Sequence, residues 1–310
     1  MTQTYLQRSV ARFARVLALS IALIAPGVLA QNSTAVDPEA EAQAAFAAAK
    51  AVMQAGPADI AFRDQATLKL PAGYVFVPSK EAARILKSMG NRVGDDLIGV
   101  IFPNDGANWF VSARYIASGY IKDDDAKDWK ADELLDNIKT GTEEANRERK
   151  SRGIPEIEVL GWVERPHYDA ASHRLVWALS SKEKGTADSA EKGINYNTYA
   201  LGREGYVSLN LVTDLRSVEA QKPIAQQFLA ALNFADTKRY ADFNSSTDHI
   251  AEYGLAALVG GIAAKKLGML ALIIAFGAKF FKIIAVAVIG GLAVFGKFFK
   301  RNKTPEAPKA

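Results

Sequence analysis

The sequence predicts an α+β protein in which an antiparallel sheet is covered by helices, with a C-terminal transmembrane helix or helical hairpin. Two observations lead to this fold class. Segments with alternating apolar and polar residues come in pairs separated by short turns, as in β-hairpins, and amphipathic helical segments lie between the pairs. Strand and helix do not alternate regularly, which argues against a parallel sheet of the doubly wound type.

The N-terminal segment has the organisation of a secretory signal peptide. Three arginines precede an apolar run, residues 16–30, that ends in Val28-Leu29-Ala30. A basic region, a short apolar region and a small residue at the end are the three parts of such a peptide. The sequence therefore predicts cleavage after Ala30. An uncleaved N-terminal anchor is the alternative, although the apolar run is short for a membrane span.

The first half of the folded part reads as a helix followed by strands and one further helix. The Ala-rich segment Pro38–Ala55 has high helix propensity and few large apolar residues, which is typical of a spacer. After it we expect two short strands within Ala66–Pro78, a helix from the capping residue Ser79 to about Met89, and strands at Leu97–Phe102 and Trp109–Ile121. The last two strands should pair as a hairpin.

The second half begins with an amphipathic helix over Asp128–Arg152, which carries leucines and an isoleucine on one face. Further strands and a closing helix are predicted at Ile157–Val163, Arg174–Ser180, Ile194–Leu201, Tyr206–Val212 and Ser217–Leu232. Residues 165–172 and 202–205 are predicted to be turns. Residues 233–243 are predicted to form a short irregular or edge segment.

Charge divides the chain into three parts. The first thirty residues contain three arginines and no acid, residues 31–253 contain 26 basic and 33 acidic residues, and residues 254–310 contain nine basic residues and one acid. The net charge of +4 therefore comes from the two ends. The mildly acidic middle argues against nucleic-acid binding, and the cationic C-terminal part suits anionic lipid headgroups. The absence of cysteine excludes disulfides, thiol catalysis and thiolate metal sites.

The C-terminal segment is organised like a membrane anchor. The uncharged stretch Ile283–Gly296 lies between two copies of a Lys-Phe-Phe-Lys motif, formed by Lys279, Phe280, Phe281, Lys282 and by Lys297, Phe298, Phe299, Lys300. Aromatic rings at the headgroup level and lysines that reach toward water are typical of the two ends of a membrane span. These eight residues are therefore predicted to lie at the membrane interface.

Two arrangements of this anchor remain open. In a hairpin, Gly254–Ala278 and Phe280–Phe299 are two spans, which fits the roughly 20 residues that a span needs but places Lys265 and Lys266 inside the first one. In the alternative only Phe280–Phe299 crosses the bilayer, which leaves the final basic cluster in the cytoplasm, as the positive-inside bias predicts. Small residues four positions apart in both segments would permit self-association.

Candidate chemistry in the folded part is concentrated in one loop. His167 and Asp169 lie in Pro166-His167-Tyr168-Asp169, and His173 follows. Two imidazoles and a carboxylate could bind a metal ion or move a proton, but their spacing matches no closed zinc site, and no cofactor is predicted. The alternative is a hairpin turn in which Asp169 bonds to nearby backbone. The run Asp123-Asp124-Asp125 either attracts Ca²⁺ or favours the start of the following helix.

A set of short strings occurs along the chain in a fixed order: Gly119–Asp125, Gly141–Asn146, Gly161-Trp162 with Pro166–Asp169, and Asn195–Thr198 with Leu201–Arg203. Together they resemble a bacterial family of predicted membrane-anchored proteins with a domain of unknown function. The resemblance runs from about Asp59 to the C-terminus. It implies an exported domain followed by a C-terminal anchor and implies no particular activity. The order of the last strand, helix and short strand also resembles the Mog1/PsbP-like fold, as an analogy of fold alone.

These features predict the following organisation: a signal peptide at 1–30, an Ala-rich helical spacer at 31–58, an exported α+β domain at 59–253, a membrane-anchoring helical region at 254–303 and a disordered tail at 304–310. The expected location is the inner (cytoplasmic) membrane, with the folded domain facing the periplasm or the cell exterior. The expected partners are the lipid bilayer and either further copies of the chain or another envelope protein.

An interaction or assembly module is the leading functional hypothesis, and an enzyme is the less favoured one. The alternatives are a metal-dependent or hydrolytic enzyme centred on His167, Asp169 and His173, and a carrier of a small ligand. A ligand that co-purifies with the folded part would favour the carrier.

Overall fold

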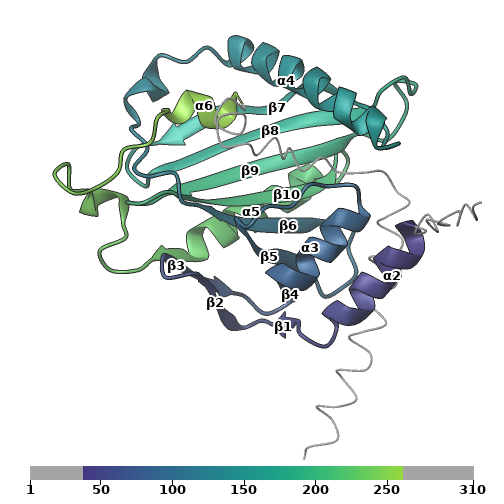
Figure 1. The fold of residues 1–310 in the computed structure, drawn as a ribbon, viewed down its shortest axis with the longest axis horizontal. Coiled ribbons are helices and arrows are strands. Elements are labelled where there is room, and N and C mark those ends of the chain that lie inside the picture. Colours follow the sequence, from purple (N-terminus) through teal and green to yellow (C-terminus); the bar gives the residue numbers. More distant parts are fainter. Residues whose placement is uncertain (1–37, 261–310) are drawn as a thin grey trace, which may run out of the picture. The chain divides into compact units, whose positions relative to one another are not determined.

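The computed structural model describes residues 38–260, and within this range one large antiparallel sheet organises the fold (Figure 1). Its strands are, in chain order, β1 (Gln54–Ala55), β4 (Tyr74–Pro78), β5 (Leu97–Pro103), β6 (Phe110–Ile116), β7 (Ile157–Asp169), β8 (Arg174–Glu183), β9 (Gly193–Leu201) and β10 (Tyr206–Asp214). In space their order is β1-β4-β5-β6-β10-β9-β8-β7, and every neighbouring pair is antiparallel. The predicted α+β class is confirmed.

A second, three-stranded antiparallel sheet consists of β2 (Ala58–Phe62), β3 (Ala66–Leu70) and β11 (Leu232–Phe234), with β3 in the middle. The helices are α2 (Pro38–Ala49), α3 (Ser79–Ser88), α4 (Ala131–Ser151), α5 (Val218–Ala231) and α6 (Leu255–Val259), with short 3-10 helices η1 (Asp124–Lys127) and η2 (Tyr240–Asp242). Among the residues described, no helix is long and apolar enough to cross a membrane.

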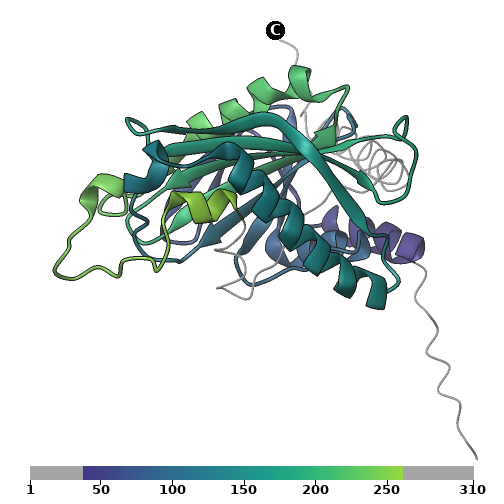
Figure 2. The same cartoon turned by 90° about the horizontal axis from the view of Figure 1, so that it is seen from above.

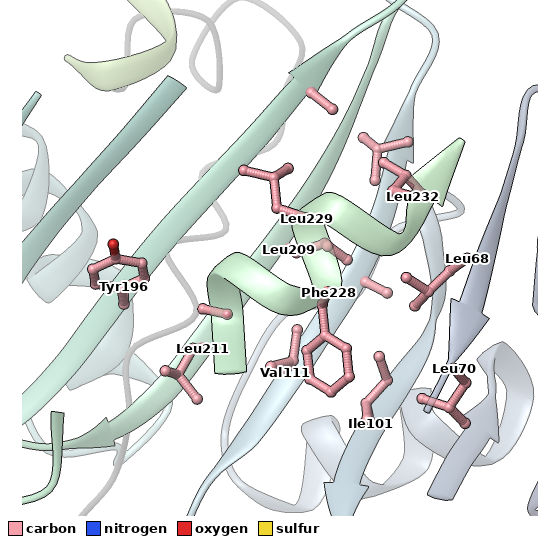
Figure 3. Close-up of a cluster of buried hydrophobic side chains, with 14 of the residues drawn as sticks. Leu68, Leu70, Ile101, Val111, Tyr196, Leu209, Leu211, Phe228, Leu229 and Leu232 are labelled. Carbon is pink, nitrogen blue, oxygen red and sulfur yellow. The ribbon is translucent and has the colours of Figure 1, made fainter. Parts of the chain in front are cut away.

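One face of the large sheet is covered by α5 and the small sheet. Phe228 and Leu229 of α5 lie against Leu209 of β10 and Val111 of β6, while Leu68 reaches the same cluster from β3 (Figure 3). The buried positions of β3 alternate with less buried ones, as a strand with one covered face requires. The ring of Phe228 also meets Tyr74 edge-on at 4.8 Å between centroids.

The opposite face is covered by two separate groups of helices. α2 and α3 pack over β4 and β5, where Phe46 meets Phe102 at 5.7 Å between ring centroids. α4 and α6 pack over β7, β8 and β9, with Leu134 and Ile138 of α4 in the core. Figure 2 shows α5 on one side of the sheet and α4 with α6 on the other. The central strands β6 and β10 lie between the two helix groups (Figure 1).

Three differences from the predicted boundaries change how the chain is organised. The helix expected over Pro38–Ala55 ends at Ala49 and packs into the core, so this part of the predicted spacer belongs to the folded unit. Residues 165–169, predicted as a turn, continue β7, where the N–H-free Pro166 is tolerated because β7 is the edge strand.

The third difference concerns the predicted anchor region, which begins at residue 254. Its first residues form α6, and Leu255, Leu258 and Val259 are buried in the core with α4. Apolar residues at the end of the folded part therefore serve packing. The predicted signal peptide, the predicted tail and residues 261–303, including both Lys-Phe-Phe-Lys motifs, lie outside the described residues.

Candidate functional site

The structure gives the three residues of the predicted His167/Asp169/His173 loop different hydrogen-bond partners. His167 is exposed on β7, and the neighbouring Tyr168 points to the opposite face of the strand because side chains alternate. Asp169 accepts hydrogen bonds from the Ala171 N–H at 2.9 Å and the Ser172 hydroxyl at 2.5 Å. The Ser172 and backbone hydrogen bonds lower the pKa of Asp169. Asp169 therefore closes the β7–β8 turn.

His173 instead joins a cluster at one corner of the sheet. Tyr168 donates its hydroxyl proton to Asp123 at 2.7 Å, and the same oxygen lies 3.2 Å from Nδ1 of His173. Burial, followed by the hydrogen bond to Asp123, raises the pKa of Tyr168. The backbone carbonyl of His173 accepts the N–H of Leu201 at 3.0 Å, which fixes the turn. Tyr168 thus links the acid run to the histidine.

Aromatic rings extend this corner cluster, which we define as Tyr120, Asp123, Tyr168, His173, Tyr240 and Phe243. The Tyr240 ring lies 4.1 Å from the imidazole of His173 and 4.4 Å from Tyr120, measured between centroids. Tyr120 also stacks on Phe243 at 3.8 Å. The Tyr240 hydroxyl donates to the Ile121 carbonyl at 2.8 Å, and burial raises its pKa. The cluster ties η2 and the segment after it to the sheet.

The segment 244–250 is held by two further contacts. Arg203 donates from Nε and Nη2 to the two carboxylate oxygens of Asp248, at 2.7 and 2.8 Å. This paired hydrogen bond is the main reason why the pKa of Asp248 lies well below its ordinary value. A Cβ atom at Gly119 would lie 2.6 Å from the His249 carbonyl oxygen, so only glycine permits this approach at φ +87°.

The acid run has a role different from both predictions. Asp125 accepts the backbone N–H groups of Leu255 and Ala256, each at 3.0 Å, and so satisfies the first turn of α6. Asp123 binds Tyr168, and the helix expected near Asp128 begins at Ala131. Within residues 38–260, no group of three or more His, Asp or Glu side chains is placed to hold a metal ion.

A second group of polar side chains lies on the helix-bearing face of the large sheet, on the central strands between the two helix groups. We call it the polar patch. It consists of Ser112 and Arg114 on β6, Ser208 and Asn210 on β10, and Asn195 and Asn197 on β9. All six residues are less than a tenth exposed. Their neighbours along each strand point to the opposite, apolar face.

Strand pairing brings the members of the polar patch into rows. Ser112 and Asn197 are both register partners of Asn210, and Ser208 is the partner of Arg114. Residues directly opposite in an antiparallel pair have Cβ atoms about 4.5–5.5 Å apart, so each row is a set of contacting side chains. Asn210 donates from Nδ2 to the side-chain oxygen of Asn195 at 3.0 Å, which connects two rows.

Within residues 38–260, several polar atoms of the patch are buried without a hydrogen-bond partner. They are Oγ of Ser112, Oδ1 of Asn210, and Nε and Nη2 of Arg114. Arg114 uses Nη1 for an ion pair with Asp96 at 2.6 Å, in which both side chains are about nine-tenths buried. Most buried polar atoms in folded proteins have partners, so a cluster without them is a candidate binding site. The polar patch is therefore the candidate functional site.

The polar patch did not emerge from the sequence, although its signal is visible there. Each of the strands β6, β9 and β10 carries two polar residues separated by one apolar or aromatic residue, a pattern that ordinary strand alternation also produces. The β9–β10 hairpin was expected, but the pairing of β6 with β10 joins distant segments and brings the third strand into the patch. Only knowledge of that pairing reveals the cluster.

Fold and site together define an antiparallel α+β domain with a buried polar site on one face of its sheet. The chain belongs to the family described as "Protein of unknown function (DUF2167)", whose sequence profile matches residues 54–290. This confirms the resemblance to a family with a domain of unknown function. No curated protein shows a significant match to the chain.

Among solved structures, the chain is similar to cyanobacterial PsbP (CyanoP) from Synechocystis. The identity is 10%, the TM-score is 0.36, and the match covers 59% of this chain and 91% of that one. It is also similar to the Ran-binding protein Mog1p of Saccharomyces cerevisiae, with 13% identity and a TM-score of 0.28 over 58% of this chain and 93% of the other. A point mutant of Mog1 gives the same identity and TM-score over 56% and 92%.

Proposed function

We propose that this protein is a membrane-tethered binding module of the cell envelope. In this proposal the folded unit holds a ligand or partner at the polar patch, and the C-terminal segment keeps the unit at the inner membrane. The observation that carries the binding role is the set of buried, unpartnered polar atoms on β6 and β10. A protein retains such atoms at a cost in stability, and functional sites are where that cost is most often found.

The tether rests on the sequence after α6. Phe280–Phe299 is an apolar stretch with a Lys-Phe-Phe-Lys motif at either end, and it has the length of one span. The packing of α6 in the core supports a single span over a hairpin. A first span of a hairpin would have to lie within 261–278, which is shorter than the roughly 20 residues required and contains Lys265 and Lys266.

The tether is tested by extraction of membranes at alkaline pH. The full chain is expected to stay with the lipid, whereas Val288→Arg should shift a substantial fraction to the supernatant, because an arginine at the centre of a span costs about 2.5–3.5 kcal/mol. Val52→Arg is the matched control, since Val52 is 40% exposed in the folded unit. If the full chain is extracted as readily as a peripheral protein, the tether is wrong.

Cysteine labelling tests the orientation of the chain, because the chain has no cysteine of its own. In intact cells, an impermeant maleimide should label Ser245→Cys, an exposed position of the folded unit, and should leave Ala310→Cys unlabelled until the membrane is opened. Labelling of both positions from outside would indicate the hairpin arrangement instead.

A further inference from the structure

The most specific feature of the polar patch is the edge of the Arg114 guanidinium that has no hydrogen-bond partner. Nη1 is bound to Asp96, but Nε and Nη2 are buried without partners. These two nitrogens form one edge of the planar guanidinium, and their N–H bonds are parallel. A carboxylate, with two oxygens at matching separation, is the group that fits such an edge.

The side chains around Arg114 add further hydrogen-bond donors and acceptors to the site. Ser112 lies two residues earlier on the same face of β6, and its hydroxyl has no partner. Oδ1 of Asn210, opposite Ser112, and Oδ1 of Asp96 are unpartnered acceptors. The site therefore presents donors for a carboxylate and, beside them, acceptors for a donor group on the same ligand.

The segment that follows the described residues is poor in carboxylates that could pair with Arg114. From residue 261 to residue 305 the sequence contains no aspartate or glutamate, so the first carboxylate side chain after the described residues is that of Glu306. Lysine and apolar side chains in that segment cannot accept a hydrogen bond, and a backbone carbonyl presents one oxygen to a guanidinium edge that has two donors. An external carboxylate is the better partner.

We propose that the polar patch binds a small organic carboxylate with an adjacent hydrogen-bond donor, that is, a hydroxy acid or an amino acid. Arg114 holds the carboxylate in a bidentate manner, Ser112 donates to it, and Asn210 and Asp96 accept from the hydroxyl or amino group. This inference rests on the proposed binding function and names the ligand class for it.

Calorimetric titration of the full chain in lipid nanodiscs tests the proposal. The probes are lactate, glycine, acetate, which has no adjacent donor, and methylammonium, which has no carboxylate. Lactate or glycine should bind with a stoichiometry of one, acetate more weakly, and methylammonium not at all. The stronger of the first two identifies a hydroxy acid or an amino acid. The absence of saturable binding of both at about 10 mM, well above a millimolar Kd, would overturn the proposal.

Variants assign the binding to the site. Arg114→Lys keeps a positive charge near Asp96 but lacks the bidentate edge, and it should weaken binding by about 10- to 100-fold. Arg84→Lys, at an exposed arginine paired with Glu41, should leave the affinity unchanged. If Arg114→Lys does not fold, Ser112→Ala, a smaller change, should still weaken binding several-fold. If the folded variants of the polar patch bind with unchanged affinity, the polar patch is not the binding site.

Two further outcomes separate this inference from the proposed function. Glu306→Gln should not alter binding, because Glu306 has no part in the proposed site; tighter binding in this variant would show that the tail competes for Arg114 and would overturn the external ligand as its resident partner. If the chain binds lactate or glycine but is extracted like a peripheral protein, the carboxylate site is supported and the membrane tether is wrong. If the chain is embedded in the membrane but binds neither lactate nor glycine, the tether is supported and the carboxylate site is wrong.

Discussion

Ser112 and Thr198 are both buried hydroxyl residues of the central strands, but they differ in their partners. Oγ1 of Thr198 donates to the Leu209 carbonyl at 3.0 Å on the apolar face of the sheet. Oγ of Ser112 has no partner. A buried hydroxyl with a partner contributes to stability, whereas one without a partner opposes it through the loss of its hydration. The two residues therefore distinguish a structural role from a binding role.

We expect Ser112→Ala to leave the free energy of unfolding unchanged or to raise it by up to about 1 kcal/mol in the ligand-free protein. Thr198→Val, the matched change at a satisfied hydroxyl, should lower it by about 1 kcal/mol. Urea denaturation followed by circular dichroism measures both. A loss in Ser112→Ala as large as that in Thr198→Val would mean that the patch serves stability and would count against the proposed binding role.

At the scale of elements, α6 depends on a residue from a different part of the chain. Its first N–H groups are satisfied by Asp125, which lies in η1, and Leu255 and Leu258 then reach the core beside α4. A five-residue helix has little stability by itself, because nucleation is costly. The cap and the core contacts together hold it in place.

Asp125→Ala should lower the free energy of unfolding by about 0.5–2 kcal/mol, the usual range for loss of a helix cap. Asp124→Ala, at the exposed neighbouring acid, should change it by less than about 0.5 kcal/mol. Hydrogen exchange gives the local readout: the amides of Leu255 and Ala256 should exchange faster only in Asp125→Ala. Equal effects of the two substitutions would contradict the assignment of the cap.

The elements that sequence predicts well are those with a strong local pattern. The β5–β6 and β9–β10 hairpins and helices α3, α4 and α5 are found close to their predicted places, because their periodicity follows from which face is buried. β2 was missed because a five-residue strand with two alanines has little pattern. The extension of β7 through Pro166 depends on its place at the sheet edge, which only the assembled sheet determines.

The candidate site was less predictable than the fold. His173 was singled out from the sequence, but its partners Tyr168 and Asp123 come from other segments, and His167 and Asp169 have different surroundings. The sequence does not identify Arg114 as a site residue, because a single arginine in a strand is common. Its burial and its free edge arise from packing that brings together residues distant in sequence.

At the scale of the whole described unit, the two faces of one sheet carry separate cores. Phe228 belongs to the core under α5, while Trp177 belongs to the core under α4 and α6. Because the same strands contribute to both, loss of packing on one face weakens the strands on which the other face depends. We therefore expect cooperative unfolding of the two cores.

Phe228→Ala should lower the free energy of unfolding by about 3–5 kcal/mol, because Phe228 is fully buried against the sheet. Gln227→Ala, at an exposed position of the same helix, should have an effect below about 0.5 kcal/mol. The denaturation midpoints from tryptophan fluorescence and from far-ultraviolet circular dichroism should shift together. Two separate midpoints in Phe228→Ala would show that the two cores unfold independently.

The pairing of β6 with β10 also has a consequence for how the molecule is made. The strands up to β6 emerge from the ribosome long before β10, so the growing chain holds a half-sheet whose open edge carries Ser112 and Arg114. Such an edge is prone to wrong pairing, and closing it over a long stretch of sequence is slow. The polar patch forms only at that closure, so its first appearance would mark the moment when the nascent large sheet joins its two halves.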